Sequence, residues 1–76
     1  MTKKEIFEFS KENNCALVED ENYFNELIKG MAFNRIQLGD EKLNAWFLRG
    51  NFVGFTWHDK EEKKDYNFVR IYLGKR

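Results

Sequence analysis

Large apolar residues in the second half of the chain alternate with polar residues, which is the two-residue period of a β-strand. The alternation predicts an antiparallel meander of three or four strands, near residues 33–38, 43–49, 52–58 and 66–73. Both faces of this sheet would carry large apolar side chains. A chain of 76 residues can cover one such face with helices, so the uncovered face is the candidate working surface.

The firmest element of the meander is a hairpin with Gly50-Asn51 as its turn. Both residue types tolerate the positive φ angles that two-residue primed turns require. This turn pairs Arg49 with Phe52, and paired residues share a face of the sheet. The charged loop before Tyr66 does not fix the register of the last strand, and a slip of one residue would exchange its faces. The loop at 39–42 leaves open which face Ile36 and Leu38 occupy. A four-residue loop pairs Leu38 with Leu43 and places both aliphatic residues on the aromatic face.

With this register, one face of the sheet is aliphatic with indole rings and is the predicted core face. Its members are Trp46, Leu48, Val53, Phe55, Trp57, Val69, Ile71 and Leu73. The opposite face mixes aromatic rings with two arginines and a histidine. Its members are Phe47, Arg49, Phe52, Thr56, His58, Tyr66, Phe68, Arg70 and Tyr72.

The first half of the chain predicts two helices. Thr2 and Glu5 have the spacing of a capping box, so a helix is expected from Lys3 to about Asn13. The apolar run at 16–18 is either an edge strand or a buried linker. A second helix follows Asp20, whose carboxylate can accept from the free N–H groups at a helix start. Apolar residues then recur at helical spacing, at Tyr23, Phe24, Leu27, Ile28 and Met31.

These elements predict a single α+β domain over residues 1–76, with two helices packed on one face of a three- or four-stranded antiparallel meander. Phe24, Leu27 and Ile28 of the second helix are expected to join Phe55 and Trp57 in the core.

The aromatic and cationic face has two functional interpretations and one structural one. As a protein-binding patch it would use Phe47, Arg49, Phe52, Phe68, Arg70 and Tyr72, because rings and arginines dominate interface energetics. As a site for single-stranded nucleic acid it would use Arg49, Arg70, Lys75 and Arg76, with the rings stacking bases. Alternatively, the rings pack beneath a helix or at a dimer seam.

Charge and cysteine content narrow these interpretations. The formal net charge is 0, which disfavours a partner held mainly by phosphate electrostatics. The single cysteine, Cys15, can form no internal disulfide and is expected to be a small buried hydrophobe. No apolar run reaches the length of a signal peptide or membrane span, so a cytoplasmic location without membrane contact is expected.

The sequence carries no catalytic or cofactor signature. His58, beside Asp59, is the single histidine, and it lacks an evident partner for acid–base chemistry. There is no glycine-rich phosphate loop, nucleophile elbow or metal-ligand spacing, so neither a cofactor nor a metal is expected. The run from Asp59 to Asp65 is expected to be a solvated hairpin tip.

One resemblance bears on an enzymatic alternative. Arg49-Gly50-Asn51-Phe52 and Leu73-Gly74-Lys75-Arg76 resemble the strand turn and the basic ending of RelE-type mRNA interferases. The resemblance spans Trp46 to Arg76 and implies an RNA-cleaving activity. The chain departs from that family in its neutral charge and in beginning with a capped helix.

The favoured hypothesis is a non-enzymatic interaction module that binds a protein partner through the aromatic and arginine face. The partner could be a second copy of the chain, because a two-fold contact lets one patch cover itself. Small solitary domains of this composition fit a phage or mobile-element protein that modulates a host protein. Nucleic-acid binding is the less favoured alternative, and an mRNA interferase is the least favoured.

Overall fold

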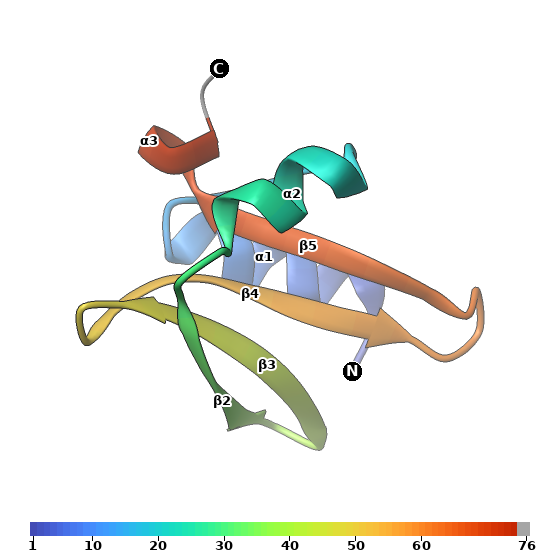
Figure 1. Cartoon of the computed structure of the whole chain (residues 1–76). Helices are drawn as coiled ribbons and strands as arrows, with labels where there is room; N and C mark the ends of the chain where they lie inside the picture. The colour runs from blue at the N-terminus through green and yellow to red at the C-terminus, as the bar shows by residue number, and fades with distance from the viewer. Residues whose placement is uncertain (75–76) are drawn as a thin grey trace.

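The protein, described for residues 1–74 by a computed structural model, forms one five-stranded antiparallel sheet flanked by short helices (Figure 1). The elements are α1 (Lys3–Glu12), β1 (Cys15–Leu17), α2 (Glu21–Leu27), β2 (Ala32–Leu38), β3 (Glu41–Leu48), β4 (Asn51–Asp59), β5 (Lys64–Arg70) and α3 (Ile71–Gly74). The strand order is β1-β5-β4-β3-β2. The α+β class is confirmed. The apolar run after α1 is an edge strand, which gives five strands where three or four were expected.

Both helix starts have the predicted caps. The Thr2 hydroxyl accepts from the Glu5 N–H at 3.3 Å, and the Thr2 N–H donates to the Glu5 carboxylate at 2.9 Å. Asp20 accepts from the N–H of Tyr23 at 3.1 Å. Helix α2 ends at Leu27, one turn before the apolar pattern does. No helix within residues 1–74 combines the length and hydropathy needed to cross a membrane.

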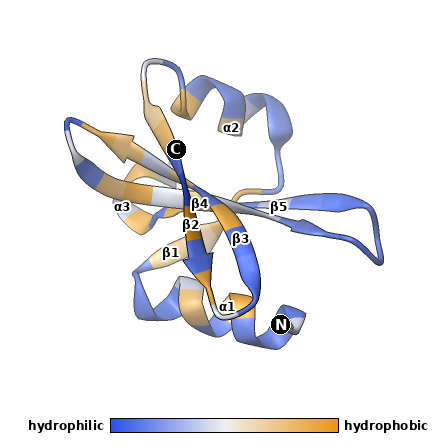
Figure 2. Ribbon diagram, turned by 90° about the horizontal axis from the view of Figure 1, so that it is seen from below, coloured by the Kyte–Doolittle hydropathy of each residue, from blue (hydrophilic) through white to orange (hydrophobic). Residues whose placement is uncertain are grey.

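The two longer helices lie on opposite faces of the sheet, which corrects the expectation that both cover one face (Figure 2). Phe9 of α1 contacts Phe55 with ring centroids 5.1 Å apart, whereas Phe24 of α2 contacts Trp46 at 6.1 Å. Ala45 pairs with Phe55 and the next residue, Trp46, pairs with Gly54. Trp46 and Phe55 therefore face opposite sides, because successive residues of a strand alternate. Each helix therefore covers apolar residues on its own face of the sheet.

The β3–β4 hairpin exists, but its turn is one residue earlier than expected. Leu48 pairs with Asn51, so the turn residues are Arg49 and Gly50, with φ angles of 54° and 82°. Positive φ at both positions is what a primed two-residue turn requires. A bulge between Trp46 and Phe47 shifts the register again. Trp46 therefore faces away from Phe55, where the sequence placed them together.

The last strand also differs by one residue from the expected register. Phe68 pairs with Phe55, and Tyr66 with Trp57, so these four side chains share the face beneath α1. The buried cluster on this face consists of Ile6, Cys15, Leu43, Phe55, Trp57, Tyr66 and Phe68. Ile71 was expected in the core but lies in α3 with half of its surface exposed.

The remaining core predictions fare differently. Phe24 and Val69 are buried, as expected, whereas Leu27 and Ile28 are half-buried. The β2–β3 turn is the two-residue Gly39-Asp40, with Leu38 paired to Glu41. The face of Ile36 and Leu38, which the sequence left open, is the face beneath α1, where both side chains pack against the buried cluster.

Candidate functional site

The exposed large apolar side chains of residues 1–74 gather at one end of the sheet. They are Phe33 (56% exposed), Leu48 (39%), Ile71 (50%) and Tyr72 (69%). Phe33 at the start of β2 pairs with Trp46 in β3, so Leu48, two residues after Trp46, is a diagonal neighbour of Phe33 on the same face. Helix α3 follows directly from β5, and Figure 1 shows it on the same side as the β3–β4 turn.

Half-buried aromatic rings and an arginine lie at the same end of the sheet but on its other face, because Phe47 follows Trp46, the partner of Phe33. Phe47 and Phe52 are direct cross-strand partners with ring centroids 6.0 Å apart and an interplanar angle of 76°. The guanidinium of Arg70 lies 5.6 Å from the centre of the Phe52 ring, and its Nε donates to the Phe52 carbonyl at 3.3 Å. Two contacts thus fix the arginine against the ring. We call the whole surface the apolar end, comprising Phe33, Phe47, Leu48, Arg49, Phe52, Arg70, Ile71 and Tyr72.

The structure places the predicted protein-binding residues unequally. Phe47, Phe52 and Arg70 are brought together, Arg49 is exposed in the turn, and Tyr72 is exposed in α3. Phe68 is different, because it is fully buried and stacks on Phe55. The expectation that Phe68 is exposed is wrong, and the cause is the one-residue difference in the register of β5.

Sequence reasoning misses three members of the apolar end. The alternation assigns Leu48 and Ile71 to the core. It places Phe33 in a strand but assigns it no role in binding. The position of Phe33 at the start of an edge strand was the available signal. Nothing in the alternation alone shows that β5 stops at Arg70, which is what carries Ile71 out of the sheet.

The apolar end is cationic and contains no acid. Residues 31–35, 45–54 and 67–74 include no aspartate or glutamate. No carboxylate within residues 1–74 forms an ion pair with Arg49 or Arg70. Lys75 and Arg76, the other predicted nucleic-acid contacts, lie outside the described residues.

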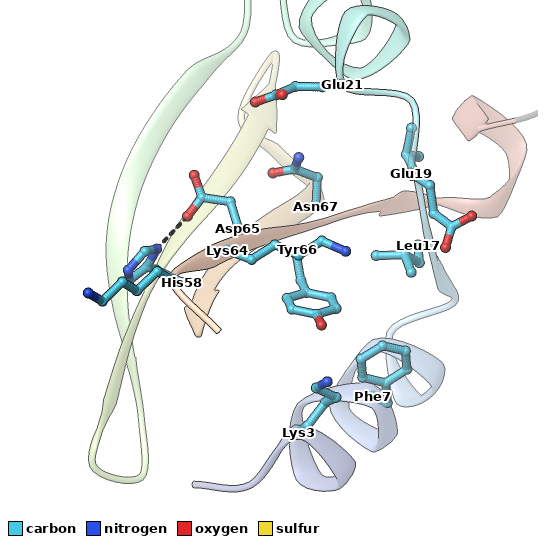
Figure 3. Close-up of a pocket in the computed structure, with 12 residues that line it drawn as sticks. Lys3, Phe7, Leu17, Glu19, Glu21, His58, Lys64, Asp65, Tyr66 and Asn67 are labelled. Carbon is cyan, nitrogen blue, oxygen red and sulfur yellow. Dashed lines mark hydrogen bonds and ion pairs between the residues drawn. The ribbon is translucent and has the colours of Figure 1, made fainter. Parts of the chain in front are cut away.

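A cleft of about 610 Å³ lies at the opposite end of β5, beside the start of α1 (Figure 3). Phe7 and Tyr66 form its apolar wall, with ring centroids 6.0 Å apart. Its rim mixes signs, with lysines near the glutamates that precede and begin α2. This mixture gives the cleft no clear preference for a charged ligand.

His58, the candidate acid–base residue, pairs with Asp65 rather than with Asp59. Its Nδ1 lies 2.8 Å from Asp65 Oδ1, and both side chains are more than half exposed. Asp59 is buried and accepts from the Glu61 N–H at 3.0 Å. Among residues 1–74 no group of three or more His, Cys, Asp or Glu side chains could hold a metal ion. The His58–Asp65 pair is exposed to solvent.

The charged hairpin tip is tied to α1 through Glu62. Its carboxylate pairs with Lys3 and accepts from the Tyr66 hydroxyl at 2.8 Å. Hydrogen bonds from Lys3, and then from Tyr66, lower the pKa of Glu62 to about 2. Cys15 is buried as expected, and burial raises the pKa of its thiol.

Comparisons with protein-family models, with curated proteins and with solved structures found no significant match to this chain.

Proposed function

We propose that the protein is a small binding module that recognises a protein partner through the apolar end and acts by binding rather than by catalysis. The observation that carries this proposal is the gathering of exposed apolar side chains at one end of the sheet. Exposed apolar surface is costly in water, and large amounts of it on a soluble domain mark interaction sites. The alternative for such a surface is non-specific association.

The residue types at the apolar end suit a compact interface. Aromatic and arginine side chains contribute much of the binding energy of protein interfaces. Tyr72 and Phe33 offer large rings that lose little conformational freedom on contact. Arg70 is already held against Phe52, so part of the surface is ordered before a partner arrives.

The charge of this end indicates the chemistry of the partner. Arg49 is exposed and Arg70 half-buried, with no acid nearby in the sequence. An apolar surface bordered by carboxylates would complement them. A two-fold contact between two copies would instead bring like charges together, which costs free energy. We therefore favour a different protein with an acidic rim over a second copy of the chain.

The test is capture by the tagged chain from the native cytosol, followed by identification and purification of the retained protein. The double variant Leu48→Ser/Tyr72→Ser should lose this protein while keeping a cooperative melting transition, because both side chains are exposed. The control Lys4→Ser/Lys11→Ser changes two exposed positions of α1 and should retain it. Equal retention by all three chains would refute the proposal.

Two other outcomes would reassign the surface. A concentration-dependent dimer in sedimentation, abolished by Leu48→Ser/Tyr72→Ser, would make the partner a second copy. Capture that is lost after nuclease treatment would favour nucleic acid. Nucleic acid is the second candidate because the apolar end carries arginines without acids and exposes the Tyr72 ring. In that case binding of single-stranded RNA or DNA should weaken steeply with salt. Cleavage of the RNA would favour the interferase resemblance.

A further inference from the structure

The sheet face beneath α2 carries three rows of side chains that run across the strands. The first row is apolar and is Phe33, Trp46, Gly54 and Val69. The second row is polar, and its members are direct cross-strand partners: Arg35, Asn44, Thr56 and Asn67. The third consists of the pairs Gln37–Lys42 and His58–Asp65. Phe24 of α2 packs on the apolar row through Trp46.

Six residues of the two polar rows line a hollow on this face of the sheet. It has a volume of about 190 Å³ and is lined by Arg35, Lys42, Asn44, Thr56, His58 and Asp65. Arg35 comes from β2 and Lys42 from β3. Since Arg35 pairs with Asn44, Lys42 is its diagonal neighbour on the same face. Diagonal positions on one face are within reach of long side chains, so both cations can approach one ligand.

The two cations of this pocket lack an acidic partner among the described residues. No acid within residues 1–74 forms an ion pair with Arg35 or Lys42. The Thr56 hydroxyl accepts from the Trp46 indole N–H at 3.0 Å and donates to Asn67 Oδ1 at 2.9 Å. These two hydrogen bonds hold the Thr56 hydroxyl in place at the wall of the pocket.

Asp65 is the acidic member of the pocket, and it is already engaged. A carboxylate accepts hydrogen bonds, so the His58 Nδ1 must donate to it across their 2.8 Å separation. With Arg35 and Lys42 both charged, the pocket retains an excess of positive charge.

We infer that this pocket binds a single phosphate-type oxyanion, with Arg35 and Lys42 as its principal ligands. A guanidinium presents paired N–H donors that match two oxygens of a phosphate, and an ammonium adds a point charge. The volume supports one anionic group, because pockets for drug-sized molecules span roughly 300–1,000 Å³. The site is separate from the apolar end, so it does not depend on the proposed protein partner.

Titration of inorganic phosphate into the full ¹⁵N-labelled chain tests the site, with sodium chloride at equal ionic strength as the reference. Saturable shifts should appear at the backbone amides of Arg35, Lys42 and Asn44 and at the Arg35 Nε–H. Charge-assisted hydrogen bonds are the stronger kind, so Arg35→Gln and Lys42→Gln should each weaken binding by roughly tenfold. Asp65→Asn should tighten it by removing the opposing charge.

The matched control is Lys11→Gln, which removes one cation from α1 on the other side of the sheet and should leave phosphate affinity unchanged. Linear shifts that chloride reproduces, or an affinity that survives both Arg35→Gln and Lys42→Gln in folded protein, would overturn the inference. A nucleoside monophosphate and a single-stranded oligonucleotide distinguish the source of the oxyanion. If the mononucleotide shifts these same amides and binds more tightly than free phosphate, the oxyanion belongs to a small ligand. If the oligonucleotide does so, it belongs to a nucleic-acid backbone.

Discussion

Phe55 and Phe68 lie face to face across the β4–β5 ladder, with ring centroids 4.7 Å apart and ring planes at 17°. Both are fully buried. Two rings of α1 contact this pair by their edges: Phe9 contacts Phe55 at 5.1 Å, and Phe7 contacts Phe68 at 5.3 Å. The stacked pair is therefore where the helix and the centre of the sheet meet.

Truncation of Phe68 should destabilise the protein severely. Phe68→Ala removes a fully buried side chain and leaves a cavity, so the free energy of unfolding should fall by about 3–5 kcal/mol. Tyr72→Ala is the matched aromatic control at an exposed position and should change stability by less than about 0.5 kcal/mol. Urea unfolding of both variants measures the difference. Similar values for the two would mean that Phe68 lies outside the core.

Gly54 should tolerate no side chain, because β5 approaches its backbone closely. A Cβ at this position would meet the carbonyl oxygen of Phe68, and Val69 Cα at 3.0 Å. Gly54→Ala must push β4 and β5 apart and should cost about 1–3 kcal/mol, as overpacked cores do. Hydrogen exchange should show lost protection at the β5 amides that face β4.

Gly30→Ala is the control for Gly54→Ala. Gly30 has a φ of 79°, but a Cβ at this position would meet no atom within 4 Å, so its substitution strains the backbone without a clash. It should lower stability while leaving β5 protected. Loss of β5 protection in both variants, or in neither, would contradict the steric argument.

The sequence predicts the helix starts and the hairpin because their signals are local. Thr2 with Glu5 needs only the first turn of α1, and a hairpin near Gly50 follows from the turn residues. The faces depend on register, which is not local. Moving the turn to Arg49-Gly50 changes the pairing by two residues and keeps the faces. The bulge after Trp46 adds one residue, and this single residue exchanges the faces of the strand beyond it.

The same cause limits prediction of the functional surface. Phe47 and Phe52 stay together because the hairpin pairs them despite the shift. The face of Phe68 depends on the β4–β5 register, and the charged loop between those strands gives no sequence signal for it. Arg70 lies at the surface as the sequence predicts, but its contact with Phe52 depends on strands far apart in the sequence.

Stability should fall in acid, and Glu62 should account for part of the loss. Its pKa is lowered from 4.5 to about 2 in the folded protein by hydrogen bonds from Lys3 and Tyr66. A carboxylate with a depressed folded pKa stabilises the fold above its unfolded pKa, and this contribution is lost as the pH falls through the folded value. The urea midpoint should therefore decline between about pH 5 and pH 2.

Glu62→Gln should flatten this decline, since glutamine does not titrate. Glu12→Gln, which removes a carboxylate at the exposed end of α1, should leave its slope unchanged. A pH dependence that is identical in Glu62→Gln and the natural chain would show that the ion pair with Lys3 does not contribute.

The β3–β4 turn offers a variant that separates stability from binding. Arg49 adopts a φ of 54°, a left-handed conformation that costs most side chains roughly 1–2 kcal/mol and that asparagine tolerates better. Arg49→Asn should therefore raise the urea midpoint while removing a cation from the apolar end. Under the proposed function it should weaken capture of an acidic partner in a more stable protein, which a loss of folding could not explain.

Gly50→Ala, at a φ of 82°, should destabilise the turn without changing its charge. A destabilised Arg49→Asn chain would contradict the observed turn, and unchanged capture would remove Arg49 from the interface.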